Sequence, residues 1–469
     1  MPPRDIYLLS PRLLNPETIA VAFAKTSRSP DSFRAIAAEL SDEKSAQFHE
    51  KWVVGYGHAS VAEHAVLHLA FENVSRLAIE CIESNRLASY TEKSTRYQKW
   101  GPDDFTLPPE LEIHPLKTEF IKTCQFLFQT YADSLAPVRS LIEARTPRRE
   151  NESEEAWDRR VRSQYVDTCR FILPAAANAN LGMTANARLL EHAICKMLSH
   201  ELVEVRQIGE TVKQVARAET PTLVKYADAV PYLVESAQEF NNRSPISAGG
   251  STDWCRLVDY DPQAEPLVLA ALLYRFGDMP YSAAVQHVTS LSPQEREDLA
   301  RIGLGRLGEH DIPLRELEYC AYTFDLVMDQ GAYAEFKRHR MMTQTAQRLT
   351  THLGYATPRL IAEAGFESKY EQAMLAAAEL YEKLAGFSPA VAQYIVPNGF
   401  NRRILTRFNL REAYHFCQLR AARNAHFSIR RLALRIYEEL ARVHPLLLKY
   451  IHLPAETSSG VEADYFIHT

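Results

Sequence analysis

The feature that most constrains this chain is an order of sequence segments that occurs twice. In each half an apolar, strand-like run is followed by a helical pattern and then by a polar run that carries arginines. The expected strands are 65–71 and 319–327, the expected helices are 74–82 and 332–336, and the polar runs are 84–97 and 338–351. Recurrence of one order of elements along a chain is typical of internal duplication. The sequence therefore predicts two similar units.

The spacing of matched residues supports a duplication with one insertion. The matched residues are Arg86 with Arg340, Pro174 with Pro397, Asn186 with Asn409, and Arg188 with Arg411. The first pair is 254 residues apart, and the other three pairs are 223 residues apart. Between these two groups the first half carries a heavily charged run at 145–162, which we interpret as an exposed insertion or a solvated helix face.

The length and composition allow two or more domains. A chain of 469 residues, 46% of them hydrophobic and 24% charged, can bury a large core. The segment 236–254 is polar and rich in turn-forming residues, so it is the predicted linker. The predicted domains are therefore residues 1–235 and residues 255–469.

Charge and cysteine content argue against several classes of protein. The formal net charge of -6 is unlike that of a general nucleic-acid binder, which needs a dominant positive field. The seven cysteines are widely spaced and form no C-x-x-C pair, so we expect neither a disulfide framework nor a metal site. No apolar run has the character of a signal peptide or reaches membrane-spanning length, so we expect a cytoplasmic protein without membrane partners.

The two polar runs differ in their chemistry. In the first run Glu92, Ser94 and Arg96 alternate, so in an extended backbone all three side chains point the same way. Together they suit a phosphorylated ligand, because Arg holds phosphate in a bidentate fork. The second run opens with the cationic cluster Arg-His-Arg at 338–340, for which a surface basic patch is the structural alternative.

Together the two runs resemble the signature R-H-R-x-x-S-x-N-x-x-S-x-R-Y of the flavin-dependent thymidylate synthases. The first run matches at Arg86, Ser89, Ser94, Arg96 and Tyr97, and departs at Ser84, Asn85 and Thr91. The second run matches at Arg338, His339 and Arg340, and departs at Thr343, Thr345, Arg348 and Thr350. Each run keeps what the other has lost, and the resemblance covers nearly all of the chain as two tandem copies.

The resemblance implies an α+β fold for each copy, with a mixed β-sheet and long helices. It also implies a homotetramer in which two subunits share each active site. One subunit supplies the second half of the signature and an Arg just before a Leu-Pro step, and these groups hold the nucleotide. Another subunit supplies the leading Arg of the signature and an Arg beyond the Asn-x-Arg motif, which lies under the uracil ring.

The two copies have lost complementary parts of that site. The first copy retains the nucleotide-holding residues Glu92, Ser94, Arg96 and Arg170, but has Ser84 and Met197 in place of the partner arginines. The second copy retains the partner arginines Arg338 and Arg420, but has Ala346, Arg348, Thr350 and Tyr394 in place of the nucleotide-holding set. We infer a composite site built from both copies, with the mirror-image site abandoned. Two chains would then pair as a homodimer that forms a pseudo-tetramer.

The resemblance implies a role for each matched residue. Arg420 is the expected catalytic group, because a guanidinium that keeps its proton stabilises negative charge developing on the uracil ring. The expected substrate-binding residues are Glu92, Ser94, Arg96, Arg170 and Arg338. The expected FAD-binding residues are His58, Ser60, Arg338, His339, Arg340, Asn186, Arg188, Asn409, Arg411 and His415. Taken singly, the asparagines are also explained as helix caps and the histidines as structural residues.

The leading hypothesis is an FAD enzyme that methylates dUMP to dTMP, with 5,10-methylenetetrahydrofolate and NADPH as co-substrates. One alternative is C5 modification of another uracil nucleotide, which the departures Thr91 and Thr345 favour. The other alternative is a non-catalytic flavin- or nucleotide-binding paralogue.

Outside the site, Arg430, Arg431 and Arg435 are expected on a solvated helix face.

Overall fold

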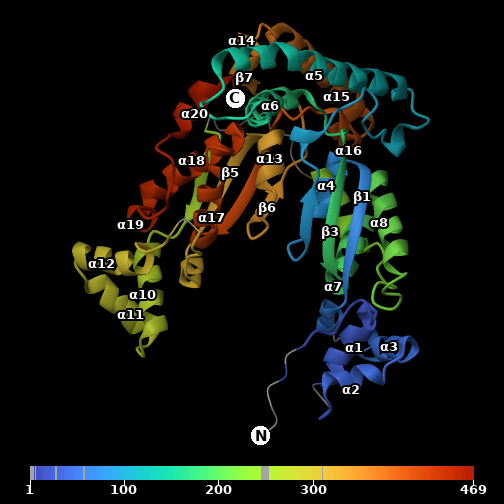
Figure 1. The fold of residues 1–469 in the computed structure, drawn as a ribbon, viewed down its shortest axis with the longest axis vertical. Coiled ribbons are helices and arrows are strands. Elements are labelled where there is room, and N and C mark those ends of the chain that lie inside the picture. The colour runs from blue at the N-terminus through green and yellow to red at the C-terminus, as the bar shows by residue number, and fades with distance from the viewer. Residues whose placement is uncertain are drawn as a thin grey trace. The chain divides into compact units, whose positions relative to one another are not determined.

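The structure, a computed structural model, describes residues 5, 7–26, 29–55, 59–243, 253–308 and 310–468. Its elements are labelled in Figure 1, and they fall into two compact units. The first unit is drawn from residues 1–98, 104–118 and 176–247, and the second from 99–103, 119–175 and 248–469. The segment 119–175 therefore packs with the second half of the sequence. The predicted first domain, residues 1–235, includes this segment.

The first unit is built on the antiparallel sheet β1-β3-β2, in which β3 is central. Its strands are β1 (Val66–Ser75), β2 (Ser89–Glu92) and β3 (Asn178–Asn186). Buried and less buried residues alternate along β3, so one face of the sheet is apolar, and α4, α7 and α8 pack together beside it. The helices are α1 (Pro16–Thr26), α2 (Phe33–Ala38), α3 (Asp42–Phe48), the π-helix η1 (His49–Gly55), the 3-10 helices η2 (Ala59–His64), η3 (Thr95–Tyr97) and η4 (Pro109–Leu111), and α4 (Arg76–Glu83), α7 (Ala187–Leu198), α8 (Val203–Ala216) and α9 (Pro231–Arg243).

The second unit is built on the antiparallel sheet β4-β5-β8-β6. Its strands are β4 (Cys255–Tyr260), β5 (Ala321–Asp329), β6 (Thr343–Ala346) and β8 (Asn401–Asn409), with a separate pair of β7 (Thr357–Pro358) and β9 (Phe466–His468). The order β5-β8-β6 repeats the order β1-β3-β2 of the first unit. The molecule is thus a mixed α+β protein, and the expected strands and helices are confirmed at β1, α4, β5 and α13.

The second unit contains many helices, of which α13, α17 and α18 contact strands of its sheet. They are α5 (Lys117–Arg145), which belongs to this unit from residue 119, α6 (Glu154–Cys169), η5 (Arg170–Ile172), α10 (Ala264–Phe276), α11 (Tyr281–Ser290), α12 (Pro293–Leu304), η6 (Arg315–Tyr319), α13 (Gln330–Phe336), α14 (Arg359–Glu363), α15 (Glu367–Phe387), α16 (Pro389–Ala392), η7 (Gln393–Ile395), α17 (Leu410–Arg420), α18 (Phe427–Val443), α19 (Pro445–Leu448) and α20 (Ser458–Tyr465). None of the helices in the described part of the chain is both long and apolar enough to span a membrane.

The two X-Pro steps matched by sequence pair with each other inside the second unit. Pro174 forms an antiparallel bridge with Pro397. The Ala175 N–H donates to the Val396 carbonyl at 3.0 Å, and the Asn398 N–H donates to the Leu173 carbonyl at 3.0 Å. Antiparallel pairing of equivalent residues is the contact that a local two-fold axis produces. The register also corrects one match, because η5 and η7 begin at Arg170 and Gln393, so Gln393 rather than Tyr394 is equivalent to Arg170.

The first part of the predicted linker at 236–254 is helical rather than turn-forming, and the division between the two units, after residue 247, falls inside the predicted segment. Residues 236–243 belong to the helix α9, and residues 244–252 lie outside the described residues. The helix forms because Pro231 suits a first helical position and good helix formers such as Glu235 and Gln238 follow it. The sequence prediction gave more weight to the turn-forming residues of the segment than to the helix propensity of its first residues.

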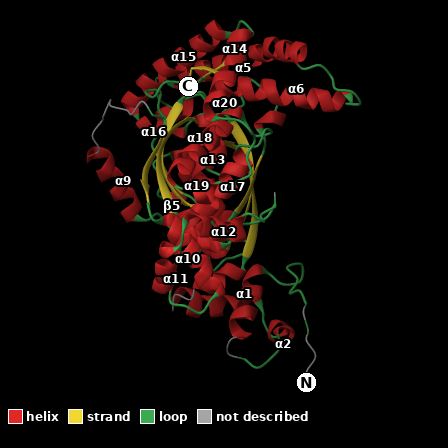
Figure 2. Cartoon of the chain, turned by 90° about the vertical axis from the view of Figure 1, so that its left-hand side faces the viewer, coloured by secondary structure: helices red, strands yellow, loops and turns green. Residues whose placement is uncertain are grey.

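The prediction that Arg430 and Arg431 lie on a solvated helix face is also wrong. Both are buried on α18. The helices α18 and α20 of the second unit pack against each other (Figure 2). The Arg431 guanidinium pairs with Glu462 at 3.2 Å and lies 4.1 Å above the centroid of the Trp254 ring. A long Arg side chain can be buried when its head group is paired and stacked, which a charge pattern alone does not reveal.

Candidate functional site

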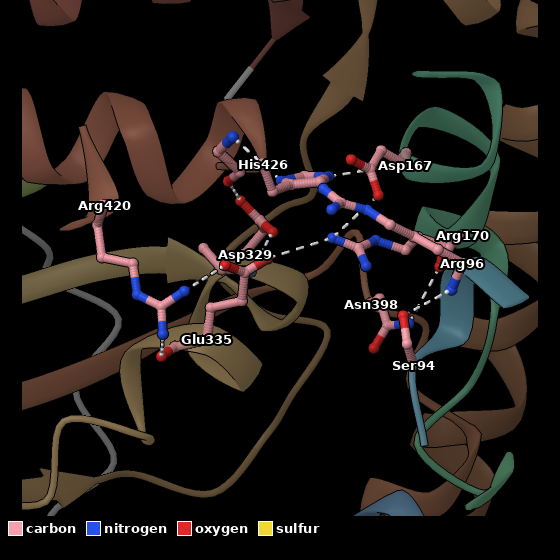
Figure 3. Close-up of polar contacts among 11 residues, drawn as sticks. Ser94, Arg96, Asp167, Arg170, Asp329, Glu335, Asn398, Arg420 and His426 are labelled. Carbon is pink, nitrogen blue, oxygen red and sulfur yellow. Dashed lines mark hydrogen bonds and ion pairs between the residues drawn. The ribbon is translucent and has the colours of Figure 1, made fainter. Parts of the chain in front are cut away.

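Two arginines converge on one carboxylate in the second unit. Arg420 Nη1 donates to Glu335 Oε2 at 2.9 Å, and Arg420 Nη2 donates to the Glu335 carbonyl at 3.3 Å. Arg170 Nη2 approaches the other carboxylate oxygen, Oε1, at 3.5 Å. Figure 3 shows both guanidinium groups directed at Glu335. Because Arg170 comes from the first half of the sequence and Arg420 from the second, this cluster combines residues of both.

Local structure positions each of these side chains. The Asp329 carboxylate caps α13 by accepting from the Ala332 N–H at 2.8 Å, and Glu335 lies in the last turn of that helix. Asn409 caps α17 by accepting from the Glu412 N–H at 2.9 Å, which places Arg420 at the C-terminus, where a cation is favoured by the helix dipole. Arg170 begins η5 directly after α6.

A histidine orients the Arg420 guanidinium. Arg420 Nε donates to His339 Nε2 at 2.9 Å, and His339 Nδ1 lies 2.9 Å from Glu412 Oε1. Since a guanidinium only donates, Nε2 must accept, and the ring proton must therefore sit on Nδ1 and point at Glu412. His339 is 4% exposed, and this burial lowers its pKa. The lowered pKa agrees with a neutral ring in which both nitrogens are hydrogen-bonded.

The charges of the cluster are partly shielded from solvent. The side chains of Arg170, Glu335 and Arg420 are 13%, 18% and 15% exposed. Burial lowers the pKa of the Arg420 guanidinium, Glu335 opposes that shift, and the neighbouring Arg338 adds to it. Asp167 gives Arg170 a second carboxylate, with its Oδ1 3.4 Å from Arg170 Nη2. Two cations and two carboxylates thus face one another where Coulomb forces are stronger than in bulk water.

The fully buried His426 ties this cluster to the helix α18. Its Nδ1 accepts from the Ser428 N–H at 3.1 Å, so its Nε2–H donates to the Asp167 carbonyl at 3.1 Å. Its ring stacks on Phe171 with 5.7 Å between the ring centroids. Burial lowers the pKa of His426. This neutral histidine therefore links the segment that carries Arg170 to the second half of the sequence.

A cavity of about 1140 Å³ lies beside α17. Its lining includes the predicted residues Asn409, Arg411 and His415 together with Glu412. The Arg411 side chain is held in place, because its Nε donates to the Pro313 carbonyl at 2.9 Å and its Nη1 to Glu318 at 2.8 Å. Glu412 reaches from this cavity to His339, so the cavity and the arginine cluster are joined by hydrogen bonds.

The first part of the nucleotide-holding set lies in the first unit. Glu92 ends β2 and pairs with Arg76 at 3.1 Å, its side chain only 2% exposed. The Ser94 hydroxyl accepts from the Arg96 N–H at 3.3 Å and caps the 3-10 helix η3. The backbone is therefore helical rather than extended at Arg96, so the extended conformation in which Glu92, Ser94 and Arg96 would point the same way is not present. A serine hydroxyl that competes for a backbone N–H favours such a turn.

The flavin set predicted in the first half falls into several places of the first unit. Asn186 caps α7 through the Leu189 N–H at 2.9 Å, and Arg188 pairs with Glu63 at 2.5 Å on the surface. Ser60 lies on η2 and lines a separate cavity of about 560 Å³. His58 lies outside the described residues.

Two further residues of the predicted set, Arg338 and Arg340, follow α13 in the second unit. Arg338 is exposed and Arg340 is half-buried. Among the described residues no group of three or more His, Cys, Asp or Glu side chains is arranged to hold a metal ion.

The sequence prediction missed the acidic members of the site, Glu335, Glu412 and Asp167. Glu335 does carry a signal, because it stands between Ala334 and the buried Phe336, just before the four consecutive basic residues 337–340, which include His339. An acidic residue on a largely buried helix needs a cationic partner. The partner Arg420, however, is 85 residues away in sequence, and no local pattern names it.

Comparison with known proteins finds one family along most of the chain. A family model described as thymidylate synthase complementing protein matches residues 9–222 and again residues 256–446. The chain is 31% identical over 447 residues to a UPF0159 protein of Chlamydia muridarum, which covers 90% of this chain and 84% of that protein. It is 28% identical to the UPF0159 protein Ta1429 of Thermoplasma acidophilum, over 91% of this chain and 94% of that protein.

Shorter proteins match part of the chain. A flavin-dependent thymidylate synthase of Thermococcus onnurineus is 29% identical over 216 residues, which are 44% of this chain and 77% of that protein. The solved structure of a flavin-dependent thymidylate synthase from Helicobacter pylori, complexed with FAD and dUMP, is 18% identical with a TM-score of 0.33, and covers 43% of this chain and 100% of that one.

Proposed function

The chain belongs to the thymidylate synthase complementing protein family, and on that premise we propose that it methylates dUMP to dTMP with FAD. In this proposal the methylene group comes from 5,10-methylenetetrahydrofolate and the reducing equivalents come from NADPH. The observation that carries it is the cluster of Arg170, Glu335 and Arg420, because it unites one arginine from each half of the sequence. That is the division of labour expected of a composite site.

The residues that bind the nucleotide follow from charge. Arg170, Arg338 and Arg420 are proposed to face the nucleotide, with phosphate the natural partner of a guanidinium fork. Arg420 is the proposed catalytic residue. Because His339 and the Glu335 carbonyl hold its guanidinium and it keeps its proton, it can stabilise negative charge on the uracil ring.

The cavity beside α17 fits a large polar cofactor. Its volume of about 1140 Å³ is ample for a dinucleotide, and Arg411, His415 and Asn409 place polar groups along it. These residues would hold FAD, which supplies the reducing equivalents that turn the transferred methylene into a methyl group. Glu412 fixes the tautomer of His339 from the side of this cavity and so keeps Arg420 oriented.

We also propose that the chain consists of two tandem copies of one fold. The repeated strand order, the two segments matched by the family model and the pairing of Pro174 with Pro397 all support this. The nucleotide-holding residues Glu92, Ser94 and Arg96 are assigned to the same substrate, and two chains are proposed to form a homodimer.

The test is direct. Purified protein should show the yellow absorbance of bound flavin and should convert dUMP to dTMP when methylenetetrahydrofolate and NADPH are added. The gene should also rescue a thymidine-requiring bacterium. A panel with UMP beside dUMP decides the alternative of another uracil nucleotide, which Thr91 and Thr345 favour. Protein that binds flavin or a uracil nucleotide but methylates neither dUMP nor UMP would instead identify a non-catalytic paralogue.

A further inference from the structure

The two arginines of the cluster are both engaged by one carboxylate of the protein itself. Glu335 uses one oxygen for Arg420 and the other for Arg170. These contacts are unequal in length. Arg420 is held at 2.9 Å, whereas Arg170 is 3.5 Å from Glu335 and 3.4 Å from Asp167, both long for a charge-assisted bond. Glu335 is therefore held more closely by Arg420 than by Arg170.

We propose that Glu335 is a displaceable counter-ion that keeps Arg170 and Arg420 neutralised until a nucleotide monophosphate binds, when its phosphate takes the carboxylate's place at Arg170 and Arg420 faces the uracil ring. This inference rests on the proposed function, because it concerns the same arginines. It differs from that function in one respect. Glu335 competes with the anionic ligand for the arginines, so it sets the affinity for the nucleotide without being required for the methylation.

The geometry allows the carboxylate to leave without disordering Arg420. Two of the three Arg420 contacts do not involve the Glu335 carboxylate, since Nε donates to His339 and Nη2 donates to the Glu335 main-chain carbonyl. Arg420 therefore stays oriented when the Glu335 side chain turns away. Asp167 likewise remains beside Arg170.

The electrostatic requirement explains why such a counter-ion is needed. Two guanidinium groups that are 13% and 15% exposed repel each other and have lost much of their hydration, so an anion must lie between them. The Glu335 side chain is itself 18% exposed, which gives it access to solvent. A phosphate dianion offers more charge and more acceptor oxygens than a carboxylate, so exchange is favourable.

The decisive variant is Glu335→Gln, which keeps the shape and removes the charge. It should bind inorganic phosphate and dUMP about tenfold more tightly than the wild type, as measured by calorimetric titration. Affinity for uncharged deoxyuridine should stay the same. The matched control is Glu382→Gln, which makes the same change in net charge at a surface pair with His352, 60% exposed, and should alter none of the three affinities.

A second variant covers the case in which Glu335→Gln does not fold. Glu335→Asp keeps the charge but shortens the side chain, so its carboxylate cannot span both arginines, and phosphate binding should tighten by a smaller factor. Equal or weaker phosphate binding in the folded variants would overturn the inference, and so would the absence of measurable phosphate binding in wild type and variants alike. If phosphate binding tightens although dUMP is not methylated and no flavin is bound, the proposed function fails while the counter-ion role stands.

Discussion

The helix pair α4 and α7 of the first unit and the pair α13 and α17 of the second occupy matched places in the repeat, but they carry different chemistry. The second unit has the connected polar residues Glu335, His339, Glu412 and Arg420. At the matched positions the first unit has Cys81, Asn85, Leu189 and Met197. The matched helix positions therefore carry connected charged groups in the second unit and mostly apolar side chains in the first.

The difference shows which features the scaffold needs and which it tolerates. Both α7 and α17 begin with an asparagine cap, Asn186 and Asn409, because the first turn of a helix leaves N–H groups to be satisfied in either unit. The helix ends are free to diverge. In the first unit Met197 is 2% exposed, and the neighbouring Lys196 donates to Ser84, the residue matched to Arg338.

The largest effect is expected when Arg420 of the second unit is replaced by methionine, the residue at the matched position 197 of the first unit. Arg420→Met should lower the rate of dTMP formation by about 10² to 10³, the loss typical of removing one charge-stabilising donor. The measurement is the single-turnover rate with flavin content checked by absorbance. Arg442→Met, which removes an arginine whose side chain is 65% exposed, is the control and should leave the rate unchanged. Full activity in Arg420→Met would end the assignment of Arg420 as catalytic.

The reverse exchange should act on stability. Met197→Arg places a guanidinium at a position 2% exposed without a carboxylate like Glu335, since the matched residue is Cys81. An uncompensated buried charge costs roughly 3–5 kcal/mol. Urea unfolding followed by circular dichroism should show a strongly lowered midpoint for the first unit. A midpoint like that of the wild type would mean that this part of the first unit can still accept an arginine.

A smaller effect tests how closely Met197 is packed. A Cβ added at Gly209 would lie 2.8 Å from Met197 Cβ and 3.3 Å from the Leu198 backbone nitrogen. Gly209→Ala should therefore destabilise the protein by about 1–3 kcal/mol despite the better helix propensity of alanine. Gly386→Ala is the matched control, because Gly386 lies in α15 with no atom within 4 Å of an added Cβ, and it should be neutral or slightly stabilising. Equal stability of the two variants would contradict the close contact.

The smallest expected effect is a pH dependence of stability that His339 gives to the second unit. Its pKa is lowered in the folded protein, mainly by burial, so the stability it contributes is fully present above its unfolded pKa of about 6.5 and is lost as the pH falls below that value. Protonation would also remove the acceptor for Arg420. His339→Asn, which copies Asn85 of the first unit, should be less stable than the wild type at pH 7.5 but closer to it at pH 5.5. A difference in urea midpoint that stays constant between these two pH values would exclude this role.

Sequence patterns predicted much of the scaffold and some of the side chains that the structure brings together, such as Arg170, His339 and Arg420. The strand-helix order, the asparagine caps and the repeat are local features, so they could be predicted at β1, α4, β5 and α13. The course of the chain after Ser94 could not, because a capping hydroxyl competed with the extended conformation there. The burial of Arg431 could not either, because Glu462 and Trp254, which pair with it and stack on it, are distant in sequence.

By itself the sequence determined the repeated order of segments, the arginines present in each half and the local elements that carry them, since these depend on residue order and short-range propensity. The tertiary structure alone decided that residues 119–175 pack with the second half, so that Arg170 and Arg420 meet at Glu335. The physical reason is that two arginines need a shared counter-ion only when both are buried. Charges far apart in the chain need one another only after folding has taken them both out of water.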